Sequence, residues 1–157
     1  MFAVSLLGLG AFEDSYLRLR GVDMVGRMAA VDIAKDINFF SRLTRNIMLG
    51  SNYDKDMQAL DKTLDRIANN FDVLEKLAFT PEEKALIAKA HEAATQFTHD
   101  GREIVAGLKD TPVEDRHLAY KEYERRATPF AVAFRQHYGS FEKAMLDSYL
   151  SVATSYT

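Results

Sequence analysis

Apolar residues recur every three or four positions along most of the chain, and this spacing predicts long amphipathic helices. The clearest stretch starts at Met57, where gaps of three and four alternate as they do along the seam of a helical bundle. Similar stretches start at Val22, Ile87 and Tyr120. The predicted seam positions are Val22, Val25, Ala29, Ile33, Ile37, Phe40 and Ile47, then Met57, Leu60, Leu64, Ile67, Phe71, Leu74 and Ala78, then Ile87, Ala90, Ala94, Phe97, Gly101, Ile104 and Leu108, and finally Tyr120, Tyr123, Ala127, Phe130, Phe134, His137 and Phe141. No stretch alternates with period two, so strands are not expected.

Start and stop signals divide these stretches into four helices. Gly50-Ser51-Asn52 ends the first, and Asp54 is placed to cap the second. Thr80-Pro81-Glu82-Glu83 combines an N-cap Thr, a Pro at the first helical position and a Glu that completes a capping box. Thr111-Pro112-Val113-Glu114 repeats this start signal. The predicted helices cover residues 12–50, 54–78, 81–109 and 112–156.

The short loops between these helices force neighbouring helices to run antiparallel. At 1.5 Å per residue the first and fourth helices would be about 58 and 67 Å long, against about 37 and 43 Å for the inner two. With the loops aligned, both outer helices overhang at the same end. We therefore predict an all-α fold, an antiparallel up-down-up-down four-helix bundle with long first and fourth helices, in a single domain over residues 1–157.

Composition narrows the function classes. The net charge of −3 does not favour nucleic-acid binding, and the lack of Cys excludes disulfides, thiolate metal sites and Cys nucleophiles. There is no Gly-rich phosphate loop, nucleophile elbow or HExxH motif. We therefore expect neither an enzyme nor a resident cofactor or metal.

The two ends of the chain are apolar or uncharged. Met1–Phe12 carries no charge, and Glu13-Asp14 follows abruptly. This run is shorter than the ~20 residues that span a bilayer. It is either the end of a transmembrane helix or an apolar first turn buried in the domain, and the abrupt switch to charge favours the membrane helix. Residues 148–157 are uncharged, have no helix stop signal and look cut within a helix.

Three segments carry a resemblance to a known family. They are Ile37–Leu49 with its two arginines, the heptad helix up to Leu77, and Thr80–Leu86. Together they resemble the four-helix-bundle ligand-binding domain of methyl-accepting chemotaxis proteins, over nearly the whole chain. Sensor histidine kinases and cyclase receptors share this build. The resemblance implies a periplasmic homodimer between two membrane helices, with a ligand site near the membrane-distal end and signalling through the last helix.

Candidate ligand residues follow from this resemblance and from side-chain chemistry. Arg42 and Arg45 match the arginines that, in the family, lie against the partner subunit and hold ligand carboxylates, as the planar guanidinium suits. The alternative is a solvated basic face. Tyr120 and Tyr123 are either pocket residues or core residues with accessible hydroxyls. The full predicted site, for a small organic anion such as a carboxylate or amino acid, is Arg42, Arg45, Tyr53, Arg102, Tyr120, Tyr123 and Arg126.

Two other interpretations stay open. A haem-binding bundle would use His137 or His99 with a Met, and an intense Soret band would reveal it, although a hydrogen-bonded core His is commoner. A plain interaction bundle would bind no ligand. Thr128-Pro129 lies inside the fourth predicted helix, where Pro either bends it statically or makes a weak point that shifts on ligand binding.

Overall fold

The computed structural model describes residues 2–77 and 79–155, with side chains for residues 24–77, 79–148 and 150–151. Within these residues the chain forms five α-helices and one 3-10 helix, and no strand. The elements are α1 (Phe2–Met48), α2 (Tyr53–Lys76), α3 (Pro81–Ala106), the 3-10 helix η1 (Val113–Ala119), α4 (Tyr120–Arg126) and α5 (Thr128–Ser155).

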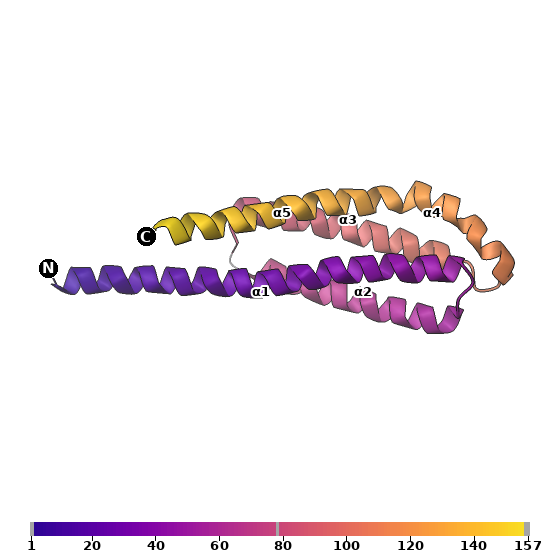
Figure 1. Cartoon of the computed structure of the whole chain (residues 1–157), viewed down its shortest axis with the longest axis horizontal. Coiled ribbons are helices and arrows are strands. Elements are labelled where there is room, and N and C mark those ends of the chain that lie inside the picture. Colours follow the sequence, from indigo (N-terminus) through magenta and orange to yellow (C-terminus); the bar gives the residue numbers. More distant parts are fainter. Residues whose placement is uncertain (1, 78, 156–157) are drawn as a thin grey trace.

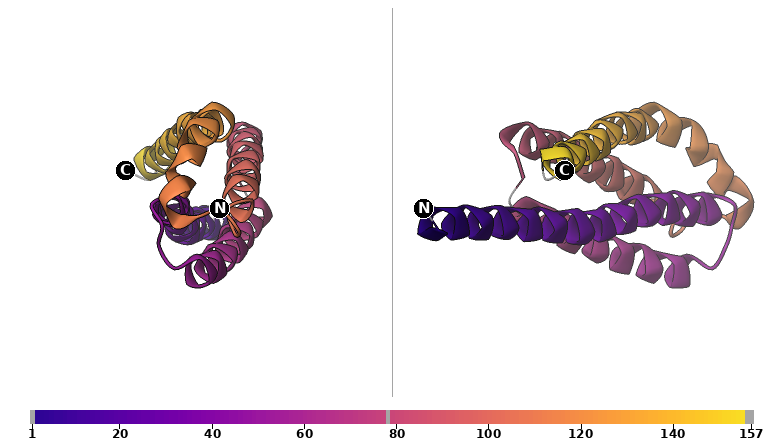
Figure 2. Two further views of the ribbon diagram at one scale, coloured as in Figure 1. Left: turned by 90° about the vertical axis from the view of Figure 1, so that its right-hand side faces the viewer. Right: turned by 60° about the vertical axis from the view of Figure 1, so that its left-hand side comes forward.

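The helices pack as two antiparallel pairs that together form a bundle-like arrangement. α1 packs most extensively on α2, and α3 on α5 (Figure 1). Two further views show α1, α2, α3 and α5 arranged around a common axis (Figure 2). The beginning of α1 and the end of α5 lie at the same end of the molecule, and both helices run past the α2–α3 turn (Figure 1). The predicted all-α class and antiparallel packing are confirmed.

The fourth predicted helix is not one helix, so the prediction of four helices is wrong in this segment. Residues 113–119 form a 3-10 helix, and a break at Ala127 separates α4 from α5. Pro129 explains the break, because it has no N–H to donate to the carbonyl one turn earlier. Around it the backbone tightens, and the Phe130 N–H donates to the Ala127 carbonyl three residues back at 3.0 Å.

The caps match the sequence signals in part. Thr80 forms the predicted capping box: its hydroxyl accepts from the Glu83 N–H at 3.2 Å, and the Glu83 carboxylate accepts from the Thr80 N–H at 3.3 Å. α2 is capped by Asn52, whose side chain accepts from the Lys55 N–H at 3.1 Å, and not by Asp54. Gly50 lies within the α1–α2 turn with a φ of +91°, a conformation that suits glycine.

Aromatic side chains dominate the core. Phe40 meets Phe97 edge-on at a ring-centroid distance of 5.3 Å, and Phe79 meets Phe141 in the same way at 5.3 Å. The largest fully buried side chains are Phe40, Phe71, Phe97, Phe134, Phe141, Ile33, Ile37, Ile47, Leu60, Leu74, Ile87 and Val105. The predicted seams of the second and third helices therefore face the core, apart from Ala78, which lies outside the described residues.

Three predicted seam residues are exposed instead: Val25, Tyr120 and Phe130. On α5 the buried positions are shifted by one residue from Phe130, to Ala131. The shift is local, because Phe134 and Phe141 stay buried as predicted and Ala131 takes the core position four residues after Ala127. The side chain of Val22, another predicted seam residue, lies outside the described residues.

The backbone of the predicted membrane segment at residues 1–12 is helical from Phe2 onward. α1 begins at Phe2, so the backbone of residues 2–12 continues the same helix that packs on α2 further along. The side-chain surroundings of this segment lie outside the described residues. No helix in the described part of the chain has both the length and the apolarity needed to cross a bilayer.

Candidate functional site

A small pocket beside the α4–α5 break brings together three of the seven predicted ligand residues. It has a volume of about 140 Å³ and lies where α1, α3, α4 and α5 meet. Arg45, Tyr120 and Tyr123 line it, as predicted. The polar lining is completed by Ser41, Thr44, Glu124, Thr128 and Arg135.

Close helix packing holds Tyr123 at the base of this pocket. A Cβ on Gly101 of α3 would lie 2.9 Å from the Phe40 ring and 3.2 Å from the Tyr123 ring, so only glycine allows this approach. The Tyr123 ring meets Phe97 edge-on at 6.2 Å. Its hydroxyl lies 2.9 Å from the Thr44 hydroxyl, which donates to the Tyr123 oxygen or to the Ser41 carbonyl. This side chain is therefore fixed before any ligand arrives.

Both tyrosines keep their protons at neutral pH. Burial raises the pKa of Tyr123 to about 12, against smaller opposing effects of Thr44 and Arg45. The pKa of Tyr120 is also raised, chiefly because its hydroxyl is hydrogen-bonded to Glu124. Tyr123 is buried, whereas Tyr120 is half exposed at 49%. Tyr120 already donates its proton to Glu124, so the Tyr123 hydroxyl is the phenol donor that remains for an anion.

The two arginines of this pocket differ in their pairing from several others on the surface, although Arg42 in the α1–α2 groove likewise pairs with no carboxylate among the described residues. Among the described residues, Arg66, Arg102, Arg125 and Arg126 all pair with carboxylates within 4.0 Å. The two arginines of the pocket, Arg45 and Arg135, form no such ion pair with any described residue. Two cationic groups without a carboxylate partner leave room for an external anion.

The other four predicted ligand residues lie elsewhere. Arg42 borders a separate groove between α1 and α2, with its guanidinium 5.8 Å from the centre of the Phe39 ring. The Arg102 guanidinium pairs with Asp61 of α2 at 2.7 Å. Arg126 pairs with Asp100 and Glu103 of α3, and the Tyr53 hydroxyl donates to the Ala106 carbonyl at 3.0 Å. The seven residues therefore do not form one pocket within a single chain.

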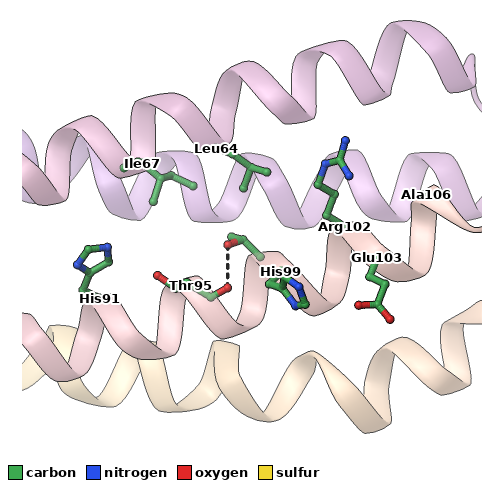
Figure 3. A pocket seen from close by; sticks show the side chains of 10 residues that line it. Leu64, Ile67, His91, Thr95, His99, Arg102, Glu103 and Ala106 are labelled. Atoms are coloured by element: carbon green, nitrogen blue, oxygen red, sulfur yellow. Dashed lines mark hydrogen bonds between the residues drawn. The ribbon is translucent and has the colours of Figure 1, made fainter.

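A larger groove lies between α2 and α3, with a volume of about 520 Å³. Leu64 and Ile67 of α2 form its apolar wall, and His91 and Arg102 of α3 point toward α2 (Figure 3). The His91 ring stacks on Phe71 at 4.4 Å, and its Nδ1 lies 2.5 Å from a Glu75 carboxylate oxygen. At this end of the groove, the polar atoms of His91 and Glu75 therefore already contact each other.

Sequence reasoning missed Thr44, Glu124 and Arg135. Thr44 had a signal: the first predicted seam jumps from Phe40 to Ile47, and position 44 fills the missing turn. A polar residue at a buried position needs a hydrogen-bond partner, which Tyr123 supplies. Arg135 had no such signal, because it is an exposed residue that does not belong to the predicted seam of its helix.

His137, the candidate haem ligand on α5, is partly buried, whereas His99 is exposed on α3. They belong to different helices, and His99 lies beside Asp100. Comparisons of the chain with models of protein families, with curated proteins and with solved structures found no match in any of the three.

Proposed function

We propose that this chain is the ligand-sensing domain of a transmembrane receptor of the chemoreceptor type, and that it binds a small organic anion beside Arg45. One observation carries this proposal: among the described residues Arg45 and Arg135 pair with no carboxylate, and they line one pocket with the protonated Tyr123. A carboxylate there would gain charge-assisted hydrogen bonds from the guanidinium groups and a further hydrogen bond from the Tyr123 hydroxyl. The ligand class is a carboxylate or an amino acid.

An exposed stripe on α1 supports a homodimer. From Met24 to Leu49 the stripe repeats with gaps of four and three, which is the spacing of a helix seam. Its members are Met24, Met28, Val31, Lys35, Asn38, Arg42, Arg45 and Leu49, all exposed. The stripe is apolar toward the beginning of α1 and polar toward the α1–α2 turn. A second copy packed on the apolar part would bring Arg42 and Arg45 to the interface, next to the pocket.

The position of the chain ends supports attachment to a membrane. α1 begins and α5 ends at one end of the bundle, and the pocket lies toward the other end (Figure 1). This arrangement suits a periplasmic domain inserted between two membrane helices, of which the apolar run at residues 1–12 would end the first. In the same proposal α5 carries the signal toward the membrane.

The α4–α5 break gives a route from ligand to signal. Arg45 belongs to α1, Tyr120 to α4 and Arg135 to α5, so one ligand would contact elements on both sides of the break. A ligand shifts an equilibrium only by its difference in affinity for the two packings. Pulling Arg135 and Tyr120 toward Arg45 would therefore favour one position of α5 relative to α1.

Thermal unfolding with a panel of carboxylates and amino acids tests the proposal. We expect at least one compound to raise the melting temperature of the wild-type chain. Arg45→Ala and Arg135→Ala should lose this rise, and so should Arg42→Ala if the ligand lies between subunits. Arg125→Ala is the matched control, because Arg125 is an exposed arginine of α4 outside the pocket. A flat response to the whole panel, or an unchanged rise in Arg45→Ala, would remove the proposed site.

A further inference from the structure

Three potential metal ligands meet on one face of α3, away from the anion pocket. His99, Asp100 and Glu103 each offer one ligand atom, and these atoms lie within 4.8 Å of one another. Glu103 follows His99 by four residues and Asp100 by three, so its side chain can meet both on the helix surface. His99 and Glu103 also border the α2–α3 groove, where they point away from α2, unlike Arg102 (Figure 3).

One ligand-atom separation in the cluster already matches that of a coordination sphere. His99 Nδ1 lies 3.3 Å from an Asp100 carboxylate oxygen. Two ligand atoms about 2.0–2.1 Å from a tetrahedral zinc ion would be about 3.3 Å apart. Burial alone would raise the pKa of Asp100, but hydrogen bonds to Gln96 and His99 and the charge of Arg126 bring it below the ordinary value. Asp100 is therefore a carboxylate at neutral pH.

A positive charge already occupies this cluster. The Arg126 guanidinium lies 3.4 Å from the Asp100 carboxylate and 3.3 Å from the Glu103 carboxylate. Both distances are long for ion pairs between such groups, which prefer about 2.7–2.9 Å. Arg126 has another partner on its own helix, since Glu122 lies 3.8 Å away. Arg126 can therefore leave Asp100 and Glu103 without losing every carboxylate.

We propose that His99, Asp100 and Glu103 form a site for a first-row divalent cation such as Zn²⁺, which Arg126 occupies in the absence of metal. One imidazole and two carboxylates suit borderline ions of this group. Ca²⁺ and Mg²⁺ are disfavoured, because Ca²⁺ needs six to eight oxygen ligands and Mg²⁺ a near-octahedral oxygen shell. Metal binding would release Arg126 from α3 and so loosen α4 next to the break at Ala127.

Calorimetric titration of the tag-free, chelator-treated protein with ZnCl₂ tests the site. His99→Ala should weaken Zn²⁺ binding about tenfold or more, since it removes the imidazole ligand. His117→Ala is the matched control, because His117 is an exposed histidine of η1 outside the cluster, and it should bind as the wild type does. CaCl₂ should give no comparable heat.

Arg126→Gln provides the sharper test. Removing the competing charge should raise Zn²⁺ affinity about tenfold, whereas a merely structural cluster would bind no better. Arg125→Gln, the neighbouring arginine, is the control and should leave the affinity unchanged. Failure of the wild type to bind Zn²⁺, equal binding by His99→Ala, or weaker binding by a folded Arg126→Gln would each overturn the proposal. If Arg126→Gln does not fold, Glu103→Gln replaces it and should weaken binding. None of these results depends on the anion pocket.

Discussion

Two nearly identical tetrapeptides, Thr80-Pro81-Glu82-Glu83 and Thr111-Pro112-Val113-Glu114, have different structures. The first forms a complete capping box and starts the long helix α3. The second is followed by the 3-10 helix η1, whose start has no side-chain cap. Local sequence therefore does not decide between them.

The surroundings of the two glutamates account for the difference. Glu83 is buried at 3% exposure, and its carboxylate also accepts from the Ser148 hydroxyl of α5 at 3.1 Å. Glu114 is exposed and has no such partner among the described residues. There, buried Arg116 binds the Thr111 carbonyl at 3.1 Å and covers the Tyr53 ring. The start of α3 is thus tied to α5, whereas the segment after α3 leads to the α4–α5 break and the candidate pocket.

The largest effect is expected near the start of α3. Phe141→Ala should lower the free energy of unfolding by about 3–5 kcal/mol, because it removes a fully buried ring packed on Phe79. Urea denaturation measures this loss. A cost below about 1 kcal/mol would mean that this end of the bundle is not the tightly packed one.

At the other end, Gly50→Ala should cost about 2 kcal/mol. The residue has a φ of +91°, which is unfavourable for alanine, and a Cβ there would overlap the Val113 side chain of η1. Leu49→Ala serves as the control, since Leu49 lies in the same turn with an exposed side chain. A neutral Gly50→Ala, again measured in urea, would contradict close packing of the α1–α2 turn on η1.

The two capping threonines give the direct comparison. Thr80→Ala should cost about 1 kcal/mol, because it removes an acceptor for the Glu83 N–H. Thr111→Ala should change stability by less than about 0.5 kcal/mol, since the carbonyl and not the hydroxyl holds Arg116. Equal costs for the two substitutions would show that both segments are capped alike.

The smallest effect concerns the pocket itself. Tyr123→Phe should cost about 0.5–1 kcal/mol at pH 7, because the Thr44 hydroxyl keeps the Ser41 carbonyl as its acceptor. Since the pKa of Tyr123 is about 12 in the folded chain, the unfolded chain loses this proton first. Wild-type stability should therefore fall as the pH rises from about 10 toward 12, and Tyr123→Phe should fall less steeply. Identical pH profiles would contradict burial of this hydroxyl.

Much of the fold could be predicted from spacing and caps, because the seams of α2 and α3 run without interruption from cap to end. The prediction failed after Thr111, where η1, α4 and α5 replace one helix. The start signal there has no tertiary partner, and Pro129 breaks the helix at Ala127. The site was predicted only in part: Arg45 and Tyr123 were singled out by resemblance and helix spacing, whereas Arg135 is an exposed residue whose place at the pocket depends on how α5 packs beside α1 and α4.

Hydrogen exchange measured along the chain tests most directly whether the segment after α3 is the adjustable part of the molecule. We expect amides of residues 113–127 to exchange markedly faster than those of α3 and of α5 beside Phe134 and Phe141. A carboxylate that raises the melting temperature should slow exchange in residues 120–127 first. Equal protection of residues 113–127 and the α5 core, with or without such a ligand, would contradict this expectation.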